Sequence, residues 1–344
     1  MNYKVSIIMP VYNAEDHLEN TLNTIINQSI GFENIELILV DDSSTDNSKN
    51  IIESYSNQYN NIVTYFSKQN HGYPGFGRNI GLKKATSKYI MFIDNDDEYD
   101  KDICKKLYET ITNENADIVC CGSLITDNIS EIKYNTEYKN GIEKKDAIII
   151  ENEDILSFEF STIWTNIYKK SIIKNNKISF PEDTRTDDFN FNIDYFLNSN
   201  KLIYLKNYYG YQWNNRDNSL SNKNKIKLIN NIINSLIYAN NRFKDKNKQQ
   251  YLVYHVKRNL QIIIVNCSFL KIGKNEFKKI LKKIYLLEKE LNFNHKLDPF
   301  WINTINKLIL HEKFTIIIWI FKIMNIVRNQ PILIKLSRKI KNLS

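Results

Sequence analysis

Short apolar runs alternate with segments of helical apolar spacing along the first hundred residues. The runs are rich in Val, Ile, Leu, Tyr and Phe, and they predict buried strands at residues 5–9, 36–40, 62–66 and 88–91. Between the first two runs, apolar residues from Leu18 to Ile26 recur at helical spacing, and a second helix is predicted over about residues 47–55. Strands that alternate with helices predict right-handed βαβ units and a parallel sheet.

Local signals set expected boundaries for these elements. Pro10 is expected to end the first strand, because proline has no backbone donor for a strand ladder. Asn13 is expected to cap the following helix, with Asp16 as an acid in its first turn. Four of the nine glycines fall within residues 72–81, and this segment is expected to form a loop before the fourth strand.

Polar residues gather where the predicted strands end. Tyr12 follows the first strand, Asp41-Asp42 the second, and Asp94 and Asp96 the fourth. Because ligands bind at the carboxyl ends of parallel strands, these residues are expected to converge at one edge of the sheet. Asp94 and Asp96 are two apart and point the same way in an extended segment, so their oxygens suit Mg²⁺ or Mn²⁺ on a diphosphate. Taken alone, the same residues also fit a polar strand end with a turn.

Four segments decide between these alternatives, because their order and spacing resemble the family 2 inverting glycosyltransferases. They are VSIIMPVYN at 5–13, VDDSSTD at 40–46, GRNIG at 77–81 and FIDNDD at 92–97. The resemblance covers roughly residues 3–220. It implies the GT-A fold, an α/β architecture with a Rossmann-like parallel or mixed nucleotide-binding sheet and flanking helices, here followed by a C-terminal helical region.

The resemblance also implies a nucleotide-sugar site at the sheet edge. Tyr12 is expected to stack on a uracil ring and Asp42 to accept its ring N–H, while Asn70 and Arg78 contact the base. The full set of expected nucleotide-sugar-binding residues is Pro10, Tyr12, Asp41, Asp42, Asn70, Arg78, Asp94, Asn95, Arg216 and Ser219.

Within this set, Asp94 is expected to hold the ribose, and Asp96, with Asp94, the metal ion. A Mg²⁺ or Mn²⁺ cofactor would offset the charge that builds on the leaving diphosphate. Simpler explanations exist: Tyr12 could only pack, the acidic pair 41–42 could only serve a helix N-terminus, and Arg78 could be a surface cation.

A catalytic base is expected further along the chain. Residues 180–191 resemble the family's acidic pair that is followed by an aromatic, here Asp187-Asp188 and Phe191. The resemblance makes Asp188 the base and Asp187 a supporting carboxylate, and two adjacent like charges raise one pKa, which suits a base. A helix that starts with acidic residues is the alternative. The preceding Trp164 could line a sugar site or fill the core.

The segment 208–221 resembles the loop that closes over the diphosphate in the family. Arg216 and Ser219 are its expected phosphate contacts, since a guanidinium fork suits phosphate oxygens. The catalytic domain is therefore predicted over residues 1–221 and a helical appendage over residues 222–344. This appendage shows apolar residues at helical spacing, first from Leu252 to Ile263 and then from Ile280 to Leu291.

The end of the chain combines an apolar run with basic residues. Residues 314–321 are apolar nearly all round, and seven Lys or Arg follow Glu312. Such a segment suits peripheral contact with an anionic membrane, but packing against the catalytic domain or in a homo-oligomer explains it equally well. The net charge is +8, yet no nucleic-acid-binding motif accompanies it, so nucleic acid is not an expected partner.

The sequence thus predicts a metal-dependent inverting glycosyltransferase. We expect the protein in the cytoplasm, with a peripheral position on the cell membrane as the alternative, because neither a signal peptide nor an 18-residue apolar span is visible. Its expected partners are a donor, in the form of a nucleotide-diphosphate sugar such as a UDP-sugar, and an acceptor hydroxyl on a polysaccharide, polyol-phosphate polymer, glycolipid or glycan. The alternatives are a nucleotidyltransferase, which would need a glycine-rich phosphate loop near residue 10, and a catalytically silent binding module.

Overall fold

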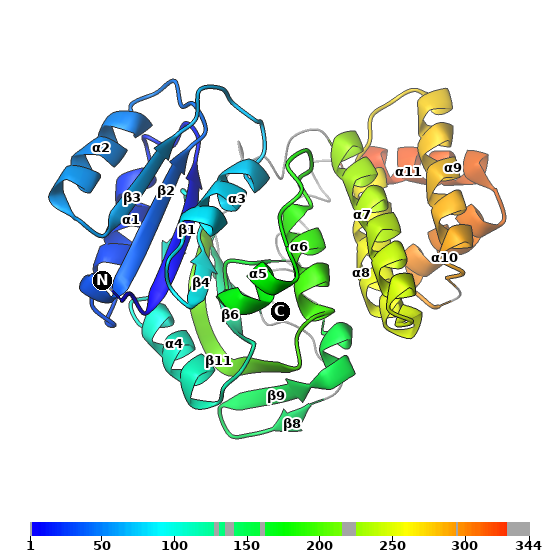
Figure 1. Cartoon of the computed structure of the whole chain (residues 1–344). Helices are drawn as coiled ribbons and strands as arrows, with labels where there is room; N and C mark the ends of the chain where they lie inside the picture. Colours follow the sequence, from blue (N-terminus) through cyan, green and yellow to red (C-terminus); the bar gives the residue numbers. More distant parts are fainter. Residues whose placement is uncertain are drawn as a thin grey trace. The chain divides into compact units, whose positions relative to one another are not determined.

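The computed structural model describes residues 2–126, 131–134, 141–158, 162–214, 225–293 and 295–328. The chain divides into two compact units, Met1–Ser219 and Leu220–Ser344. The first unit is built on a β-sheet and the second on helices, and Figure 1 shows them in blue to green and in yellow to red.

The described part of the first unit contains one sheet of eleven strands. Its main path runs β3-β2-β1-β4-β10-β6-β11-β9-β8, while β5 pairs with β11 and β7 pairs with β6. The strands are β1 (Val5–Val11), β2 (Ile35–Asp41), β3 (Ile62–Phe66), β4 (Tyr89–Phe92), β5 (Glu98–Tyr99), β6 (Ile118–Thr126), β7 (Glu131–Tyr134), β8 (Ile142–Glu143), β9 (Ala147–Glu151), β10 (Asn166–Lys169) and β11 (Lys201–Asn214).

The first four of these strands form the parallel sheet that the sequence predicts. Val5 pairs with Ile35 and Ile8 with Phe92, so β1 lies between β2 and β4 with all chain directions alike. Antiparallel β10 then joins β4 to β6, which makes the whole sheet mixed.

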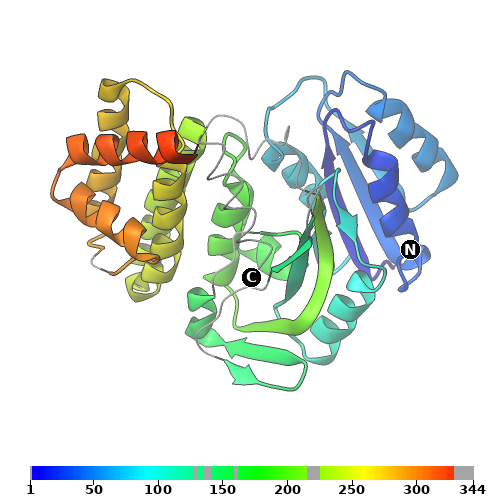
Figure 2. The ribbon, with the colours of Figure 1, turned by 180° about the vertical axis from the view of Figure 1, so that it is seen from behind.

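Helices cover both faces of the sheet, as can be followed in Figures 1 and 2. Alternate residues of β1, such as Ile7 and Met9, pack in one apolar core with α1, α2 and α4. The opposite face carries α3, because Ile8 and Pro10 lie against its glycines. The helices of this unit are α1 (Leu18–Ile26), α2 (Ser48–Gln58), α3 (Gly75–Lys84), α4 (Ile103–Asn113), α5 (Lys170–Asn175) and α6 (Asp187–Phe196), with 3-10 turns at Phe32–Asn34 and Asn152–Ser157.

Two expected boundaries are wrong. The first strand continues through Pro10 to Val11. The Val11 carbonyl accepts the Asp42 N–H at 2.8 Å, so the backbone of Pro10 faces the β4 side, where the ladder has already ended at Phe92 and no donor is needed. Asn13 does not cap α1, which begins only at Leu18. Asn13 has a φ of 46° and accepts the backbone N–H of Thr45.

The glycine-rich segment is the third difference. Residues 75–84 form helix α3 and not a loop. Glycine weakens an isolated helix, but here it permits contact that any side chain would block. A Cβ on Gly81 would overlap the Ile8 side chain, and a Cβ on Gly77 would lie 2.9 Å from the Pro10 Cβ. Close packing of helix on strand thus outweighs local propensity.

The second unit is helical, as predicted for this part of the chain. Its described residues form α7 (Lys225–Asp245), α8 (Gln249–Cys267), α9 (Lys274–Glu290), α10 (Phe300–Leu310) and α11 (Phe314–Arg328). Apolar residues of all five helices, among them Leu236, Leu260, Ile284, Ile305 and Phe321, are buried. None of the helices in the described ranges has both the length and the apolar character that a bilayer crossing requires.

Candidate active site

The carboxyl ends of β1, β2 and β4 meet at one edge of the sheet. Tyr12 follows β1, Asp42 follows β2, and the segment from Asp94 follows β4. The register brings these ends together, because Val11 pairs with Asp41 and Ile8 with Phe92. The sheet therefore brings the three polar groups to one edge, as expected.

Helix α3 delivers a guanidinium to this edge. Its close approach to β1 places Arg78, which is next to Gly77, between the end of β4 and the start of α6. The loop before α6 comes equally close, because a Cβ on Gly75 would overlap the carbonyl of Pro181. Arg78 is 3% exposed, and its guanidinium lies 5.5 Å from the Phe180 ring.

Arg78 joins three carboxylates. Its Nη2 lies 2.9 Å from Asp94 Oδ1, its Nη1 lies 2.6 Å from Asp187 Oδ2, and the same nitrogen contacts Asp188 Oδ1. A buried guanidinium requires such partners. This position differs from the base contact that the resemblance implies for Arg78, because its side chain is directed to the acidic cluster. The cluster connects the expected metal segment with the expected base.

The carboxyl groups of this cluster outnumber its single guanidinium. Burial raises the pKa of Asp188 well above its usual range, and the Asp187 and Asp94 charges raise it further, although Arg78 opposes them. Burial also raises the pKa of Asp187, again against the effect of Arg78. The Asp188 side chain is 19% exposed and that of Asp187 is 2% exposed, so Asp188 is the more accessible carboxyl of the pair. An accessible carboxyl with a raised pKa suits a proton acceptor.

Residues 95–97, which follow Asp94 after β4, lie in two environments. Asp97 is buried and accepts hydrogen bonds from the Tyr211 hydroxyl (2.6 Å) and the Asn214 N–H (2.9 Å), which tie the strand end to β11. Burial, followed by the Asp94 and Asp96 charges, raises the pKa of Asp97 well above its usual range. Asn95 and Asp96 are half-buried at the edge, and the Asn95 carbonyl accepts the Thr21 hydroxyl at 3.1 Å.

The donor set at this edge fits a hard divalent cation only in part. Asp94 and Asp96 offer carboxylate oxygens, the ligand type that Mg²⁺ and Mn²⁺ prefer. Within the described ranges no group of three or more acidic, His or Cys side chains gathers tightly enough to hold an ion alone. An ion here would need further oxygens, which a diphosphate and water supply.

The expected nucleotide side of the site lies between β2 and the start of α3. The Asp42 carboxylate accepts the His71 backbone N–H at 2.8 Å and lies 2.6 Å from His71 Nδ1, while Asn70 Nδ2 donates to the Asp42 carbonyl at 3.2 Å. Asp41 receives the Ser44 N–H on one oxygen (3.1 Å), and its other oxygen is buried with no partner among the residues that the structure describes. Tyr12 is 46% exposed beside them. An exposed aromatic ring and carboxylate oxygens that can accept hydrogen bonds therefore lie together in this part of the site.

Sequence reasoning missed His71. Its ring stacks on Phe76 with centroids 3.5 Å apart. Its Nδ1 contacts the carboxylate of Asp42, which was expected to accept a hydrogen bond from the nucleotide base. The sequence offered one hint of its role, which is its position directly after Asn70, an expected base contact.

Of three further expected residues, the structure describes Trp164. It stacks on Tyr211 with centroids 4.2 Å apart and packs against the main core while it stays partly exposed, a position that fits both core filling and the lining of a sugar site. Arg216 and Ser219 lie outside the described residues.

Comparison with known proteins finds similar glycosyltransferases. Residues 6–174 match the family described as glycosyl transferase family 2. A poly(ribitol-phosphate) beta-glucosyltransferase of Bacillus spizizenii is 31% identical over 220 residues, which are 62% of this chain and 33% of that protein. The poly(ribitol-phosphate) beta-N-acetylglucosaminyltransferase TarS of Staphylococcus aureus is 30% identical over 215 residues, 60% of this chain and 35% of that protein. The chain thus spans about a third of the length of these two relatives.

Solved structures share the fold. The crystal structure of S. aureus TarS 1-349 in complex with UDP-GlcNAc has a TM-score of 0.71 at 22% identity and covers 92% of this chain and 89% of that chain. A Pyrobaculum calidifontis mannosyltransferase in complex with GDP-Man and Mn²⁺ has a TM-score of 0.53 at 13% identity, covering 96% and 89%. The predicted GT-A fold with a helical C-terminal region is confirmed. Residues 6–174 of the chain belong to glycosyl transferase family 2.

Proposed function

We propose that the chain is an inverting glycosyltransferase that moves a sugar from a UDP-sugar to a hydroxyl of a polyol-phosphate polymer. The observation that carries this proposal is the Arg78 cluster, which joins Asp94 to Asp187 and Asp188 within one site. The nature of donor and acceptor is supported by the relatives, which are named for ribitol-phosphate polymers, and by the TarS complex with UDP-GlcNAc.

In the proposed reaction Asp188 accepts the proton of the acceptor hydroxyl. The acceptor oxygen forms a bond to the anomeric carbon while the bond from that carbon to the diphosphate oxygen breaks, and attack from the opposite face inverts the configuration. Arg78 orients both carboxylates of the pair, and Asp187 adds negative charge that keeps Asp188 basic.

At the donor side, Tyr12 offers its ring to the base, and Asp42, positioned by His71, offers an acceptor for a base N–H. Asp94 and Asp96 would hold the metal, and a bound Mg²⁺ or Mn²⁺ would offset charge on the departing diphosphate. Arg78 neutralises part of the acidic charge near the same end of β4 and so lowers the repulsion that an incoming diphosphate meets.

We also propose a cytoplasmic enzyme with a peripheral membrane position. Helix α11 exposes Ile316, Trp319 and Ile323 along one stripe, and Lys313 and Lys322 are exposed beside it. Apolar and basic groups on one helix face suit an anionic lipid surface. A homo-oligomer is the competing explanation of this face.

The direct test combines the full chain with a panel of UDP-sugars, poly(ribitol phosphate) and Mn²⁺. Release of UDP together with a polymer mass that grows by hexose or N-acetylhexosamine units is expected, and NMR of the product should give the anomer opposite to the donor's. Absence of UDP release from every donor, combined with donor binding in a thermal-shift assay, would favour the silent binding module instead.

A further inference from the structure

A second concave surface lies on the α3 side of the catalytic unit. It is a groove of about 600 Å³ between α3, α5 and the loop that follows α5. Four lysines line it: Lys83 from the last turn of α3, and Lys170, Lys174 and Lys177 from α5 and the loop. Glu182 is the one carboxylate among the lining residues. A volume of this size exceeds what a single ion needs and is typical of sites that hold an extended ligand.

The charge of this groove is not balanced from within. Glu182 accepts a hydrogen bond from Asn79 Nδ2 at 2.8 Å, and none of the four lysines forms an ion pair in the part of the chain that the structure describes. Lys170 Nζ donates to the Ala85 carbonyl. The other three lysines are exposed.

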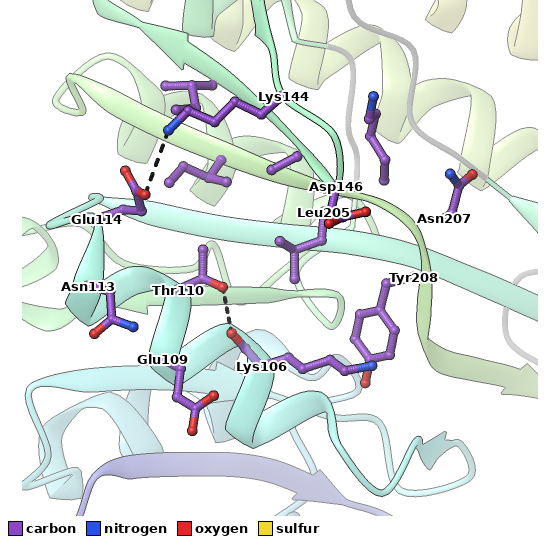
Figure 3. A pocket seen from close by; sticks show the side chains of 14 residues that line it. Lys106, Glu109, Thr110, Asn113, Glu114, Lys144, Asp146, Leu205, Asn207 and Tyr208 are labelled. Atoms are coloured by element: carbon purple, nitrogen blue, oxygen red, sulfur yellow. Dashed lines mark hydrogen bonds and ion pairs between the residues drawn. The ribbon is translucent and has the colours of Figure 1, made fainter.

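A pocket of similar volume elsewhere in the catalytic unit provides a contrast (Figure 3). It has about 590 Å³ and also contains three lysines, but these alternate with acids. Lys144 lies 3.8 Å from Glu114, Lys206 lies 2.7 Å from Glu143, and Lys106 lies over the Tyr208 ring. Its cations are compensated, whereas those of the groove on α3 are not.

The groove is built onto the same turn of α3 as the acidic cluster. Arg78 turns to the catalytic carboxylates, and its neighbour Asn79 turns to the groove side, where it donates to the Phe180 carbonyl and accepts the Phe180 N–H, both at 2.8 Å. The loop that starts at Phe180 passes Glu182 in the groove and then leads directly into Asp187 and Asp188 at the start of α6. A ligand in the groove would therefore lie beside the segment that carries the proposed base.

We propose that this groove binds the acceptor polymer at a distance from the reacting hydroxyl, as a subsite for its phosphodiester groups. The inference rests on the proposed function, from which the polymer is taken, and the groove itself supplies the positive charge that suits phosphodiester groups. A concave surface with uncompensated cations suits a flexible chain with repeated negative charges better than a flat bilayer. Lysines act on phosphates as point charges and do not require one fixed geometry, which suits a repeating polymer that must move between additions.

Stabilisation of helix ends is the competing role of these lysines. The C-termini of α3 and α5 each carry about half a negative charge, and a nearby lysine offsets it. Four full positive charges exceed that requirement. A role limited to helix ends would appear in thermal stability and not in polymer affinity, so the two roles can be measured separately.

The first experiment measures binding and needs no catalysis. The variant Lys83→Gln/Lys174→Gln/Lys177→Gln removes three exposed charges and leaves Lys170, which bonds the Ala85 carbonyl. Its control, Lys101→Gln/Lys105→Gln/Lys145→Gln, removes three exposed lysines that do not line the groove. With fluorescent poly(ribitol phosphate) in anisotropy titrations, the groove variant should bind about 10-fold more weakly than wild type at low salt, and the difference should shrink as salt rises. Equal losses in both variants would show a non-specific charge effect and overturn the proposal.

The second experiment separates this proposal from the proposed reaction. The groove variant should raise the KM for the polymer about 10-fold and leave kcat and the KM for the UDP-sugar within twofold, with an unchanged melting temperature. If wild type transfers no sugar, the proposed function fails while the binding result still decides the groove. If polymer binding is unaffected but binding to phosphatidylglycerol vesicles falls, the groove serves a membrane and the polymer subsite is wrong.

Discussion

At the scale of single residues, the two carboxyls at the start of α6 differ in a way that their adjacency in sequence does not show. Both contact Arg78 Nη1, but the Asp188 side chain keeps 19% exposure and Asp187 keeps 2%. A base must reach the acceptor, so the greater exposure of Asp188 supports the proposal that Asp188, and not Asp187, is the base. In this proposal Asp187 tunes the charge of its neighbour and holds Arg78.

The first prediction concerns this pair. Asp188→Asn keeps the shape of the side chain but cannot accept the proton, so kcat should fall by roughly 10²–10⁴ while donor affinity stays near the wild-type value. Asp187→Asn should reduce kcat less. Initial rates of UDP release, with donor binding measured by calorimetry, would check both, and a larger loss at Asp187 would reverse the two roles.

A second residue-scale prediction concerns the edge of β4. Asp96→Ala should abolish transfer and leave the melting temperature within a few degrees of wild type, because the side chain is half-buried at the site and outside the core. Mn²⁺ should raise the melting temperature of wild type in the presence of UDP and should not do so in the variant. Wild-type turnover that persists in excess chelator would rule out the metal role.

At this scale the sequence anticipated residues that come together but not their contacts. Asp94, Asp187 and Asp188 lie in one cluster around Arg78, and their roles in binding and catalysis stay predictions. The three partners of Arg78 could not be predicted, because its guanidinium contacts carboxylates that lie 16, 109 and 110 positions away in the sequence. His71 was missed for the same reason, since its contact with Asp42 spans 29 positions.

At the scale of elements, α3 is where local pattern and tertiary structure disagree most. Its glycines predict a loop, and the structure forms a helix whose glycine face touches β1 and the loop before α6. The first, second and fourth strands were easier to predict, because most of their residues are apolar and buried. The left-handed Asn13 and the continuation of β1 through Pro10 depend on contacts with neighbouring strands, which the local sequence does not contain.

The helix-to-strand contact gives a third prediction. Gly81→Ala adds a Cβ that would overlap Ile8, so the free energy of unfolding should fall by about 1–3 kcal/mol. The control is Gly273→Ala in the second unit, where a Cβ would meet nothing within 4 Å. Urea unfolding should show the larger loss for Gly81, because Gly273 is the N-cap of α9 and its replacement costs only the cap preference. Equal effects would mean that the clash at Ile8 is relieved by movement of α3.

A buried acid between two helices of the second unit gives a fourth prediction. Glu288 on α9 is 1% exposed and accepts a hydrogen bond from Asn306 Nδ2 of α10 at 2.9 Å, and within the described ranges its other oxygen has no partner. Burial raises the pKa of Glu288 to about 7. An acid whose pKa is higher in the folded state destabilises the fold as pH rises from the unfolded pKa of 4.5 to about 7, here by about 3 kcal/mol in total.

Glu288→Gln should remove this loss. The variant and wild type should unfold at nearly the same temperature at pH 4.5, and the variant should become the more stable one by pH 8. Thermal unfolding of the full chain between pH 4.5 and 8 measures the difference, with the exposed Glu290→Gln as the control that should show no trend. A difference between Glu288→Gln and wild type that is independent of pH would mean that Glu288 is already charged in the folded protein.

At the scale of the whole molecule, the question is whether a membrane or another copy of the chain covers the exposed stripe of α11. Deleting the chain after Glu312 would not answer it, because Ile317 and Phe321 of this helix are buried and Phe321 stacks near Phe277 of α9. Removal of the helix would therefore expose apolar surface on α9. Substitution of the outward stripe alone keeps the packed face intact and so tests only the surface.

The fifth prediction follows from this design. Ile316→Ser/Trp319→Ser/Ile323→Ser removes side chains that are 49%, 66% and 50% exposed. The full wild-type chain should sediment with phosphatidylglycerol vesicles at low salt, and salt should weaken the binding, because each nearby lysine contributes about 1 kcal/mol that screening reduces. The variant should stay in solution, while Leu286→Ser on α9 should bind as wild type does. If wild type ignores the vesicles and the variant instead changes a dimer into a monomer, the stripe is an interface between copies of the chain, and its place on the membrane is excluded.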